Sequence, residues 1–220
     1  VLVYAKTSPE KGAKGISAFI VETDTPGFKV AQKLNKMGFR GSPTGELVFE
    51  DCTIPKENLV GHKGDAVLHM MRNLELERLT LAAMSLGIAR RSIEIMNRYA
   101  AEREAFGQPL NRFGQIQRHI AESYAEYMAG RAYVYSTAQS MELGSSGGRL
   151  DSDGVKLYCA AMAKNVADRA IQVLGGYGYV GEYTVERLWR DAKLLEIGGG
   201  TNEAHQKNMT RELSQFSRLG

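Results

Sequence analysis

Apolar residues recur every three or four positions through most of the chain after residue 64, which is the spacing of helices that bury one face. The pattern predicts helices over residues 65–99, 112–142 and 151–174, a short helix over 185–189, and a last helix over 201–213. Glycine and proline interrupt it at Gly107–Asn111, Gly144–Gly148 and Gly175–Gly176. Long antiparallel helices joined by short loops form an up-and-down four-helix bundle, so we expect a mainly α fold.

Residues 1–60 have a different pattern, in which short apolar runs alternate with turn residues. It predicts strands over residues 1–5, 15–21, 28–31 and 46–49, a turn at Thr25-Pro26-Gly27, and an irregular loop over 38–45. So few strands expose edges that need partners. Since the chain also opens in a strand at Val1, without an initiator Met, we expect it to begin inside a larger protein. We therefore predict a partial β domain over residues 1–60, followed by a helical-bundle domain over residues 61–220.

One charged residue interrupts the apolar face predicted for the helix over 65–99. Glu77 lies between Leu74 and Leu81 on that face, which consists of Val67, Met70, Leu74, Leu81, Met84, Ile88 and Ile95. A carboxylate in apolar surroundings must be paired, be neutralised by a raised pKa, or face a cavity. A raised pKa is also what a general base near neutral pH requires. Three interpretations stay open: a catalytic base, a buried ion pair with Arg78, and a face that ends at Leu74 and restarts at Leu81.

Composition and charge narrow the classes of function. The net charge of +3 comes from dispersed residues without a basic block, so we expect no nucleic-acid partner. No apolar run is long enough for a transmembrane helix, so we expect no membrane partner. Cys52 and Cys159 form no close-spaced motif, which favours a reducing compartment. The four histidines are never paired at ligand spacing, so we expect no metal site.

Three segments carry residues suited to binding a ligand. Gln172–Tyr179 and Ile197–Glu203 are rich in glycine, which lets the backbone approach a ligand closely, and a helix that opens at Thr201 offers free N–H groups. Neither segment has the spacing of a Rossmann or P-loop motif, and structural turns at helix ends are the alternative. Arg103–Gln108 combines an arginine, an aromatic ring and a glycine, which suits a phosphate and a flat ring. An arginine near a helix end also serves simply to cap carbonyls.

Together these segments resemble the acyl-CoA dehydrogenase family, in family order and over essentially the whole chain. The matching segments are Met37–Ser42, Phe49–Pro55, Glu77-Arg78, Arg103–Gly107, Gly175–Tyr179, Arg190–Lys193 and Gly200-Thr201. The resemblance reaches the second part of the family's middle β domain and its C-terminal four-helix domain. The family's N-terminal helical domain and first strands have no counterpart among these residues.

The resemblance implies FAD as cofactor, an acyl-CoA thioester as substrate and α,β-dehydrogenation as reaction. In most family members the base is a Glu two residues before the Thr of a Gly-Thr pair, a position that is Gly199 here. In the isovaleryl-CoA branch the base comes from the long helix, directly before an Arg, which matches Glu77 before Arg78. The resemblance thus implies Glu77 as the base and a short branched-chain substrate, since Gly199 leaves room for the branch.

The same residue-by-residue comparison implies the binding residues. Those implied for the substrate are Glu75, Leu76, Arg78, Gly199 and Gly200. Those implied for FAD are Arg103, Phe106, Gln115, Gln172, Val173, Leu174, Gly175, Gly176, Thr201, Asn202 and Glu203. The sequence departs from the family at Gln115, because the family's Gln often follows the Phe at 113 directly and Gly114 intervenes here.

The resemblance also implies partners and a compartment. It implies a homo-oligomer, a tetramer, in which Arg103 and the segment 172–176 contact the FAD of a neighbouring subunit. It implies an electron-transferring flavoprotein as acceptor, and either the mitochondrial matrix of a eukaryote or the cytoplasm of a bacterium. The alternatives are another short- or branched-chain acyl-CoA dehydrogenase, an acyl-CoA oxidase, and an inactive helical oligomerisation module.

Overall fold

The computed structural model describes residues 1–141 and 149–215, and only the backbone of residues 72 and 149. The predicted loop at Gly144–Gly148 lies outside the described residues. The chain divides into two compact units, Val1–Leu74 and Glu75–Gly220.

The first unit holds two small antiparallel sheets. In one, β2 (Ile16–Ile20) pairs with β1 (Leu2–Lys6) on one side and with β5 (Leu59–Val60) on the other. In the second, β3 (Phe28–Lys33) pairs with β4 (Gly45–Phe49). The four predicted strands are confirmed within a few residues, whereas β5 and the short 3₁₀ helices η1 (Pro9–Gly15) and η2 (Lys56–Asn58) were not predicted.

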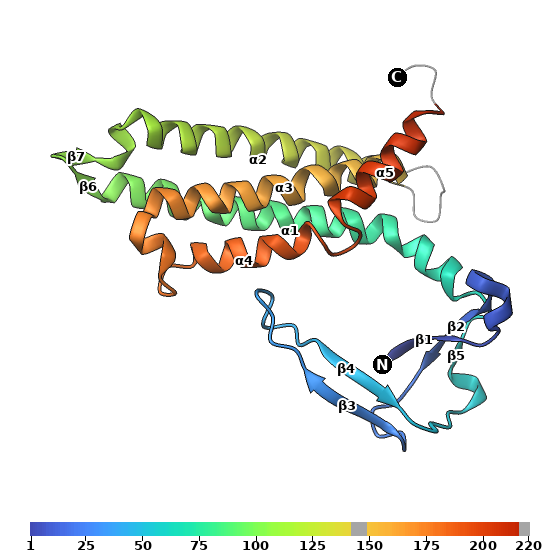
Figure 1. The fold of residues 1–220 in the computed structure, drawn as a ribbon. Helices are drawn as coiled ribbons and strands as arrows, with labels where there is room; N and C mark the ends of the chain where they lie inside the picture. The colour runs from blue at the N-terminus through green and yellow to red at the C-terminus, as the bar shows by residue number, and fades with distance from the viewer. Residues whose placement is uncertain (142–148, 216–220) are drawn as a thin grey trace. The chain divides into compact units, whose positions relative to one another are not determined.

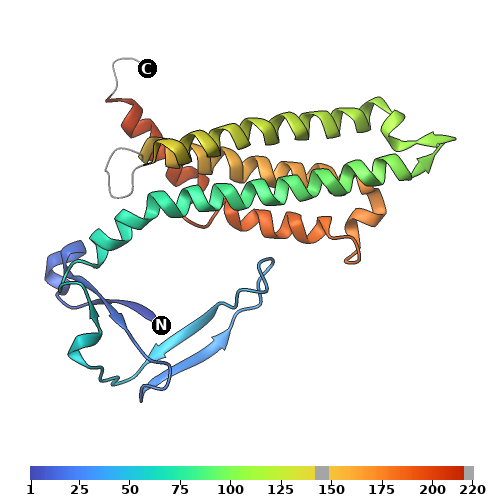
Figure 2. The same ribbon diagram turned by 180° about the vertical axis from the view of Figure 1, so that it is seen from behind.

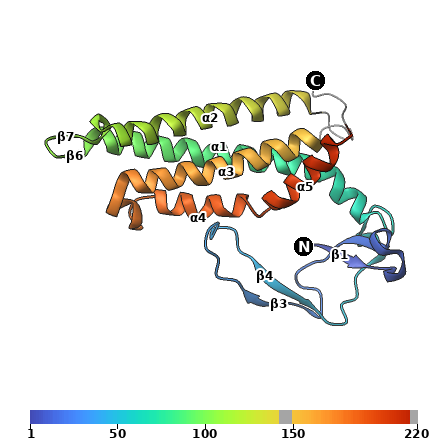
Figure 3. The ribbon, with the colours of Figure 1, turned by 45° about the horizontal axis from the view of Figure 1, so that its top comes forward.

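The second unit is an up-and-down bundle, as the sequence predicts (Figure 1). Its helices are α1 (Ala66–Glu102), which begins in the first unit, α2 (Gly114–Ser140), α3 (Arg149–Leu174) and α4 (Val185–Leu195), followed by α5 (Asn202–Leu213). Figures 1 and 2 show α1, α2 and α3 side by side, and α3 also contacts α4 and α5. In Figure 3, α5 lies at one end of the bundle, opposite the hairpin of β6 (Glu104–Ala105) and β7 (Gln108–Pro109).

Two turns of 3₁₀ helix complete this unit: η3 (Leu110–Arg112) before α2, and η4 (Gly175–Tyr179) directly after α3. The bundle is mainly helical, and its long helices match the predicted ranges within a few residues. Only α4 is clearly longer than predicted, since it reaches Leu195.

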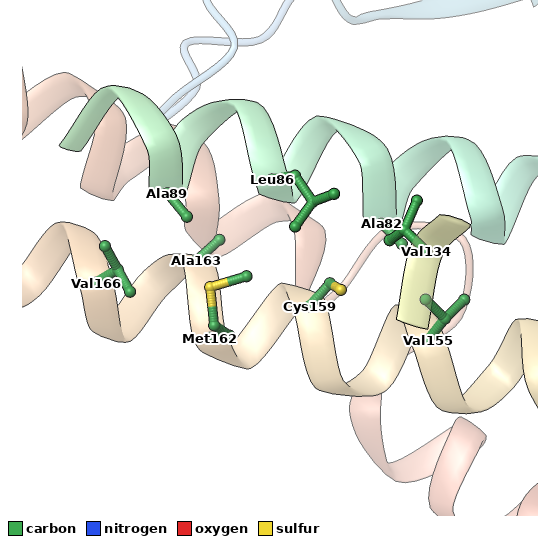
Figure 4. Packing of buried hydrophobic residues seen from close by; sticks show 9 residues of the cluster. All are labelled: Ala82, Leu86, Ala89, Val134, Val155, Cys159, Met162, Ala163 and Val166. Atoms are coloured by element: carbon green, nitrogen blue, oxygen red, sulfur yellow. The ribbon is translucent and has the colours of Figure 1, made fainter. Parts of the chain in front are cut away.

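The core lies between α1 and α3 (Figure 4). One cluster joins Ala82, Leu86 and Ala89 of α1, Val134 of α2, and Val155, Cys159, Met162, Ala163 and Val166 of α3. A second cluster, toward the other end, contains Met96, Ala100, Ala170, Val173, Leu174 and Val185. Small residues dominate the contact face of α1, which lets the two helices approach closely.

The buried face of α1 is therefore not the face that the sequence predicts. None of the seven large apolar residues of the expected face is fully buried, and Met84 keeps 39% of its surface exposed. The residues that α1 buries include Ala82, Ser85, Ala89 and Ser92, together with Arg78. Close packing selects the side with small side chains and leaves the large apolar ones at its margins.

Candidate active site

The candidate site is built around Glu77 on α1 and the glycine turn at residues 198–200 between α4 and α5. Gly199 has a φ of 65°, in the left-handed region that favours glycine. A Cβ added to Gly199 would lie 3.6 Å from Glu77 Oε1 and would collide with Leu81 Cδ1. The Glu77 carboxylate thus lies within contact distance of the point where a side chain of residue 199 would begin, so Glu77 and residue 199 are neighbours in space.

The Glu77 side chain is exposed, so the prediction that it occupies a core position is wrong. The reason is the rotation of the buried face of α1 by one residue, which buries Arg78 in its place. The alternative of a Glu77–Arg78 ion pair is also wrong, because Arg78 Nη1 pairs with Asp153 Oδ1 of α3 at 2.9 Å. Glu75 is half-buried and Leu76 is exposed on the same turn of α1.

Behind the glycine turn lies a network of buried charged and polar side chains from three helices. Asp153 is fully buried, forms an ion pair with Arg78 and accepts a hydrogen bond, at 2.6 Å, from Nδ1 of the fully buried His205 on α5. Lys156, also fully buried on α3, donates from Nζ to the Gly200 carbonyl at 2.6 Å. Among the described residues, Asp153 Oδ2 and His205 Nε2 have no hydrogen-bond partner.

Burial changes the proton affinity of Lys156. It lowers the pKa of the ammonium to about 8, mainly through loss of solvation and then through the nearby positive charge of Arg78. The carboxylates of Glu196, Asp153 and Glu203 act in the opposite direction.

Asp153 and Lys156 were not singled out from the sequence, and His205 was considered there only as one of four histidines without ligand spacing. The helical pattern gave no clear signal for the first two. α3 buries every residue from 152 to 156, so this part of the helix has no single buried face, and Asp153 and Val155, two positions apart, do not share a side of it. No local signal joins His205 to Asp153, because they are 52 residues apart.

The first turn of α5 borders the glycine turn. Thr201 caps the helix as predicted, since its Oγ1 accepts from the Ala204 N–H at 3.2 Å. Hydrogen bonds from its own backbone N–H and from Thr201 lower the pKa of the exposed Glu203. Asn202 is half-buried. These groups gather at a helix N-terminus, where free N–H groups attract negative charge.

The remaining sequence-predicted site residues lie at the opposite end of the bundle. Arg103 directly follows α1, and Phe106, at the tip of the β6–β7 hairpin, is 97% exposed. Gln115 is exposed on the first turn of α2. Gln172 is exposed and Val173 and Leu174 are buried on the last turn of α3, which Gly175 and Gly176 of η4 follow.

This end of the bundle offers a surface suited to a phosphate and a flat ring. A Cβ added at Gly175 or Gly176 would meet no atom within 4 Å, so the backbone there is open to close approach. The guanidinium of Arg103 is exposed. A cavity of about 300 Å³ between the last turns of α1 and the end of α3 is lined by Arg98, Tyr99 and Leu174, among others.

The structure thus sorts the predicted site residues into two groups. Glu75–Arg78, Gly199 and Gly200 lie together with Thr201–Glu203. Arg103, Phe106, Gln115 and 172–176 form the second group. Arg103 follows Glu77 by 26 residues along one helix, which at about 1.5 Å per residue separates them by about 39 Å.

Two further properties concern the described residues only. None of their helices is long and apolar enough to cross a membrane. Nor do three or more His, Cys, Asp or Glu side chains within 1–141 and 149–215 come together in a way that could hold a metal ion.

Comparison with known proteins places this geometry in a family. Residues 1–52 match the model of the acyl-CoA dehydrogenase middle domain, and residues 67–214 match that of the acyl-CoA dehydrogenase C-terminal domain. The mitochondrial isovaleryl-CoA dehydrogenase of Oryza sativa subsp. japonica is 47% identical over 97% of this chain and 52% of its own length. The mitochondrial 2-methylacyl-CoA dehydrogenase of Solanum tuberosum is 46% identical over the same shares.

A solved structure agrees with the sequence comparison. Butyryl-CoA dehydrogenase from Megasphaera elsdenii superposes with a TM-score of 0.91 at 37% identity, covering 97% of this chain and 56% of that one. The chain therefore spans about half the length of the relatives that it matches. Members of the matched family are FAD-dependent flavoproteins. The chain belongs to the acyl-CoA dehydrogenase family and carries parts of its middle and C-terminal domains.

Proposed function

We propose that the protein containing this chain is an FAD-dependent dehydrogenase of short branched-chain acyl-CoA, of the isovaleryl-CoA type, with Glu77 as the base. The observation that carries the proposal is the position of Glu77 Oε1, 3.6 Å from where a side chain of residue 199 would begin. Most family members are expected to place their base at residue 199. This chain has glycine there and a carboxylate from α1 beside it.

The role of Glu77 is to accept the proton from the α-carbon of the thioester. The Glu77 carboxylate is exposed, so an acyl chain can approach it. An acyl chain lying over Glu77 would displace water from the carboxylate. The exposure of Glu77 in this chain is thus compatible with the proposed role.

The buried arginine behind Glu77 fixes the base. Arg78 is held by Asp153 at 2.9 Å, so this part of α1 is tied to α3. A base on a rigid helix turn keeps its oxygen at a defined place, and errors of about 1 Å in such a place cost about a hundredfold in rate. Glu75 and Leu76 lie on the same turn and are proposed to border the substrate.

The two groups of predicted residues fit the two ends of FAD. When bound, FAD supplies the acceptor for the hydride that leaves the β-carbon. Thr201, Asn202 and Glu203 would lie beside its ring system, near Glu77. Arg103, Phe106 and Gln115 together with residues 172–176 would hold the pyrophosphate and adenylate half of an FAD from a neighbouring subunit. The open glycines at 175 and 176 and the exposed guanidinium support this assignment.

The size of residue 199 supports a branched substrate. A glutamate at that position would crowd Glu77, whereas glycine adds no side chain there. Leu81 bounds this space, since its Cδ1 already lies where a Cβ of residue 199 would be placed. A methyl branch near the reacting carbons would meet an apolar wall there and not a charged group.

A second substrate class is favoured by one observation. The 2-methylacyl-CoA dehydrogenase of Solanum tuberosum is 46% identical to this chain, against 47% for the isovaleryl-CoA enzyme of Oryza sativa. The two substrates differ in whether the branch is on the α- or the β-carbon. Similarity of this degree does not separate them.

The remaining parts of the proposal rest on family membership. We infer an electron-transferring flavoprotein as the electron acceptor and a homotetramer as the assembly. We also infer the mitochondrial matrix as the compartment in a eukaryote, or the cytoplasm in a bacterium.

A substrate panel on the full-length, FAD-loaded protein tests the proposal. We expect the highest kcat/KM for isovaleryl-CoA or 2-methylbutyryl-CoA, and a lower value for straight-chain butyryl-CoA and octanoyl-CoA. Flavin bleaching under anaerobic conditions separates dehydrogenation from a mere lack of acceptor. A flavin-loaded protein that none of the acyl-CoA esters reduces would contradict the proposed function.

A further inference from the structure

Within the candidate site, the turn at residues 198–200 has the greatest backbone freedom. It consists of three glycines, and Gly199 and Gly200 have φ values of 65° and 105°. Glycine loses more conformational freedom on ordering than any other residue, so such a turn needs outside contacts to hold one conformation. Its own ends are tied by hydrogen bonds from Gly198 N–H to the Leu194 carbonyl and from Asn202 N–H to the Glu196 carbonyl.

Two buried side chains fix the turn from outside. Lys156 of α3 donates to the Gly200 carbonyl at 2.6 Å. The ring of His205 also packs on Gly200, since a Cβ added to Gly200 would lie 3.0 Å from His205 Cε1. His205 in turn is held by Asp153, which also binds Arg78 beside Glu77. A continuous chain of contacts therefore connects the turn to the candidate base.

The charge of Lys156 is unusual for a purely structural residue. The side chain is fully buried, and its ammonium binds a neutral carbonyl, while Asp153 already pairs with Arg78. Burying an ammonium without a carboxylate of its own is costly, and an apolar side chain of similar length would often be at least as stable. Departures of this kind from the best local solution are expected at functional sites.

We propose that Lys156 is a positioning residue for α-proton abstraction: its hydrogen bond to Gly200 holds the glycine turn in the conformation that places Gly199 beside Glu77. This inference rests on the proposed function. In the proposed role, Lys156 touches neither substrate nor flavin and acts through the backbone of the turn. Loss of the tether lets the turn sample other conformations and close on the space that the acyl chain must enter.

The tether depends on pH. The groups that face Lys156 are Arg78 on α1, Asp153 on its own helix, Glu196 after α4, and Glu203 and His205 on α5. Burial, aided by Arg78, lowers the pKa of Lys156 to about 8. Above that pH the amine is neutral, and its hydrogen bond to Gly200 loses the charge that makes it strong. The proposal thus predicts an alkaline limb of kcat near this pH.

The test uses three variants of the full-length, FAD-loaded protein. Lys156→Met removes the tether and keeps the length of the side chain. Lys156→Arg keeps a positive charge at every accessible pH. Lys207→Met, at an exposed lysine of α5, is the matched control. For each protein we would measure kcat and KM for isovaleryl-CoA from roughly pH 6 to 10, flavin content, and hydrogen exchange of the amides of residues 198–206.

We expect Lys156→Met to lower kcat by roughly ten- to a hundredfold, with flavin content unchanged and the alkaline limb abolished. Its amides at 198–206 should exchange faster than those of the wild type. Lys156→Arg should restore most of kcat and move the alkaline limb beyond the measured range. Lys207→Met should match the wild type in every measurement.

Three outcomes would contradict the positioning role, and the last of them also contradicts the proposed function. If the wild type reduces its flavin with acyl-CoA and Lys156→Met keeps both its kcat and its pH profile, the positioning role is wrong, whatever its melting temperature. If Lys156→Met fails to fold, Lys156→Arg provides the test, and an unchanged alkaline limb in its pH profile of kcat refutes the positioning role. If the flavin-loaded wild type does not react with any acyl-CoA, the proposed function itself fails and the positioning role falls with it.

Discussion

Replacement of Asp153 by alanine should destabilise the helical bundle far more than an ordinary surface substitution. Asp153 is fully buried, forms an ion pair with Arg78 at 2.9 Å and accepts a hydrogen bond from His205 at 2.6 Å. A hydrogen bond to a charged group contributes about 1.5–3 kcal/mol. Loss of one member of a buried ion pair typically costs about 3–5 kcal/mol, because the remaining charge stays buried and unpaired. We therefore expect a loss of about 3–5 kcal/mol.

The assay is thermal unfolding of the full-length, FAD-loaded protein, with Asp168→Ala as control. Asp168 is an exposed aspartate on the same helix, and its loss should change stability by less than about 0.5 kcal/mol. For the helical unit Glu75–Gly220, a loss of 3–5 kcal/mol should lower the melting temperature of its own unfolding transition by at least about 6 °C. The double variant Arg78→Met with Asp153→Leu should be less destabilised than Asp153→Ala, because it removes both members of the Arg78–Asp153 pair. An Asp153→Ala protein within about 1 kcal/mol of the wild type would refute the reasoning.

Three further predictions concern the candidate site. Glu77→Gly with Gly199→Glu should recover part of the activity and favour straight-chain acyl-CoA, and adding Leu81→Ala should increase the recovery, because Leu81 occupies the place of the new Cβ. Steady-state kinetics on isovaleryl-CoA and octanoyl-CoA would test this. No recovery in either variant would argue that the two carboxylate positions do not serve the same carbon. Arg103→Ala should weaken FAD retention and dimer association together, because a ligand bound across an interface stabilises it; a gel-filtration profile and flavin content equal to those of the wild type would refute it. Thr201→Ala should cost about 1 kcal/mol of stability through loss of the α5 cap, measurable by thermal unfolding, whereas an unchanged melting temperature would exclude a stabilising cap.

The order and type of the elements could be predicted from the sequence because each long helix carries a strong periodic signal. The ends of α3 and α5 were also marked, by Gly175 after the former and by Thr201 before the latter. The short β6–β7 hairpin gave no comparable signal, since Glu104–Ala105 and Gln108–Pro109 are only two residues each. Pairs this short are defined by the turn between them and not by an apolar pattern.

The buried face of α1 could not be predicted from hydrophobicity alone. Periodicity weights large apolar residues such as Met84 and Leu81, whereas helix packing selects small ones such as Ala82 and Ser85. The two faces are adjacent on the helix, and the choice between them depends on α3. The incorrect choice of face placed Glu77 in the predicted core and Arg78 outside it. The burial of Arg78 depends on Asp153, a partner 75 positions away in the sequence.

That Glu77 takes the place of a base at residue 199 was predicted from the sequence by a different argument. It followed from family resemblance, which matched a carboxylate before Arg78 and a glycine in place of the usual base. The structure adds the distance between them, 3.6 Å from Glu77 Oε1 to a Cβ at residue 199. It also adds Lys156 and His205, which no resemblance indicated. Lys156 donates to the Gly200 carbonyl, and the ring of His205 packs on Gly200.

The most direct test of the account is single-turnover flavin reduction by isovaleryl-CoA in the Glu77→Gln variant of the full-length protein. Glutamine keeps the shape of the side chain and removes its ability to take a proton. We expect FAD content and acyl-CoA binding to match those of the wild type, and the rate of flavin bleaching to fall by at least about a hundredfold. A Glu77→Gln protein that bleaches at a rate near that of the wild type would show that the base lies elsewhere and would contradict the central claim.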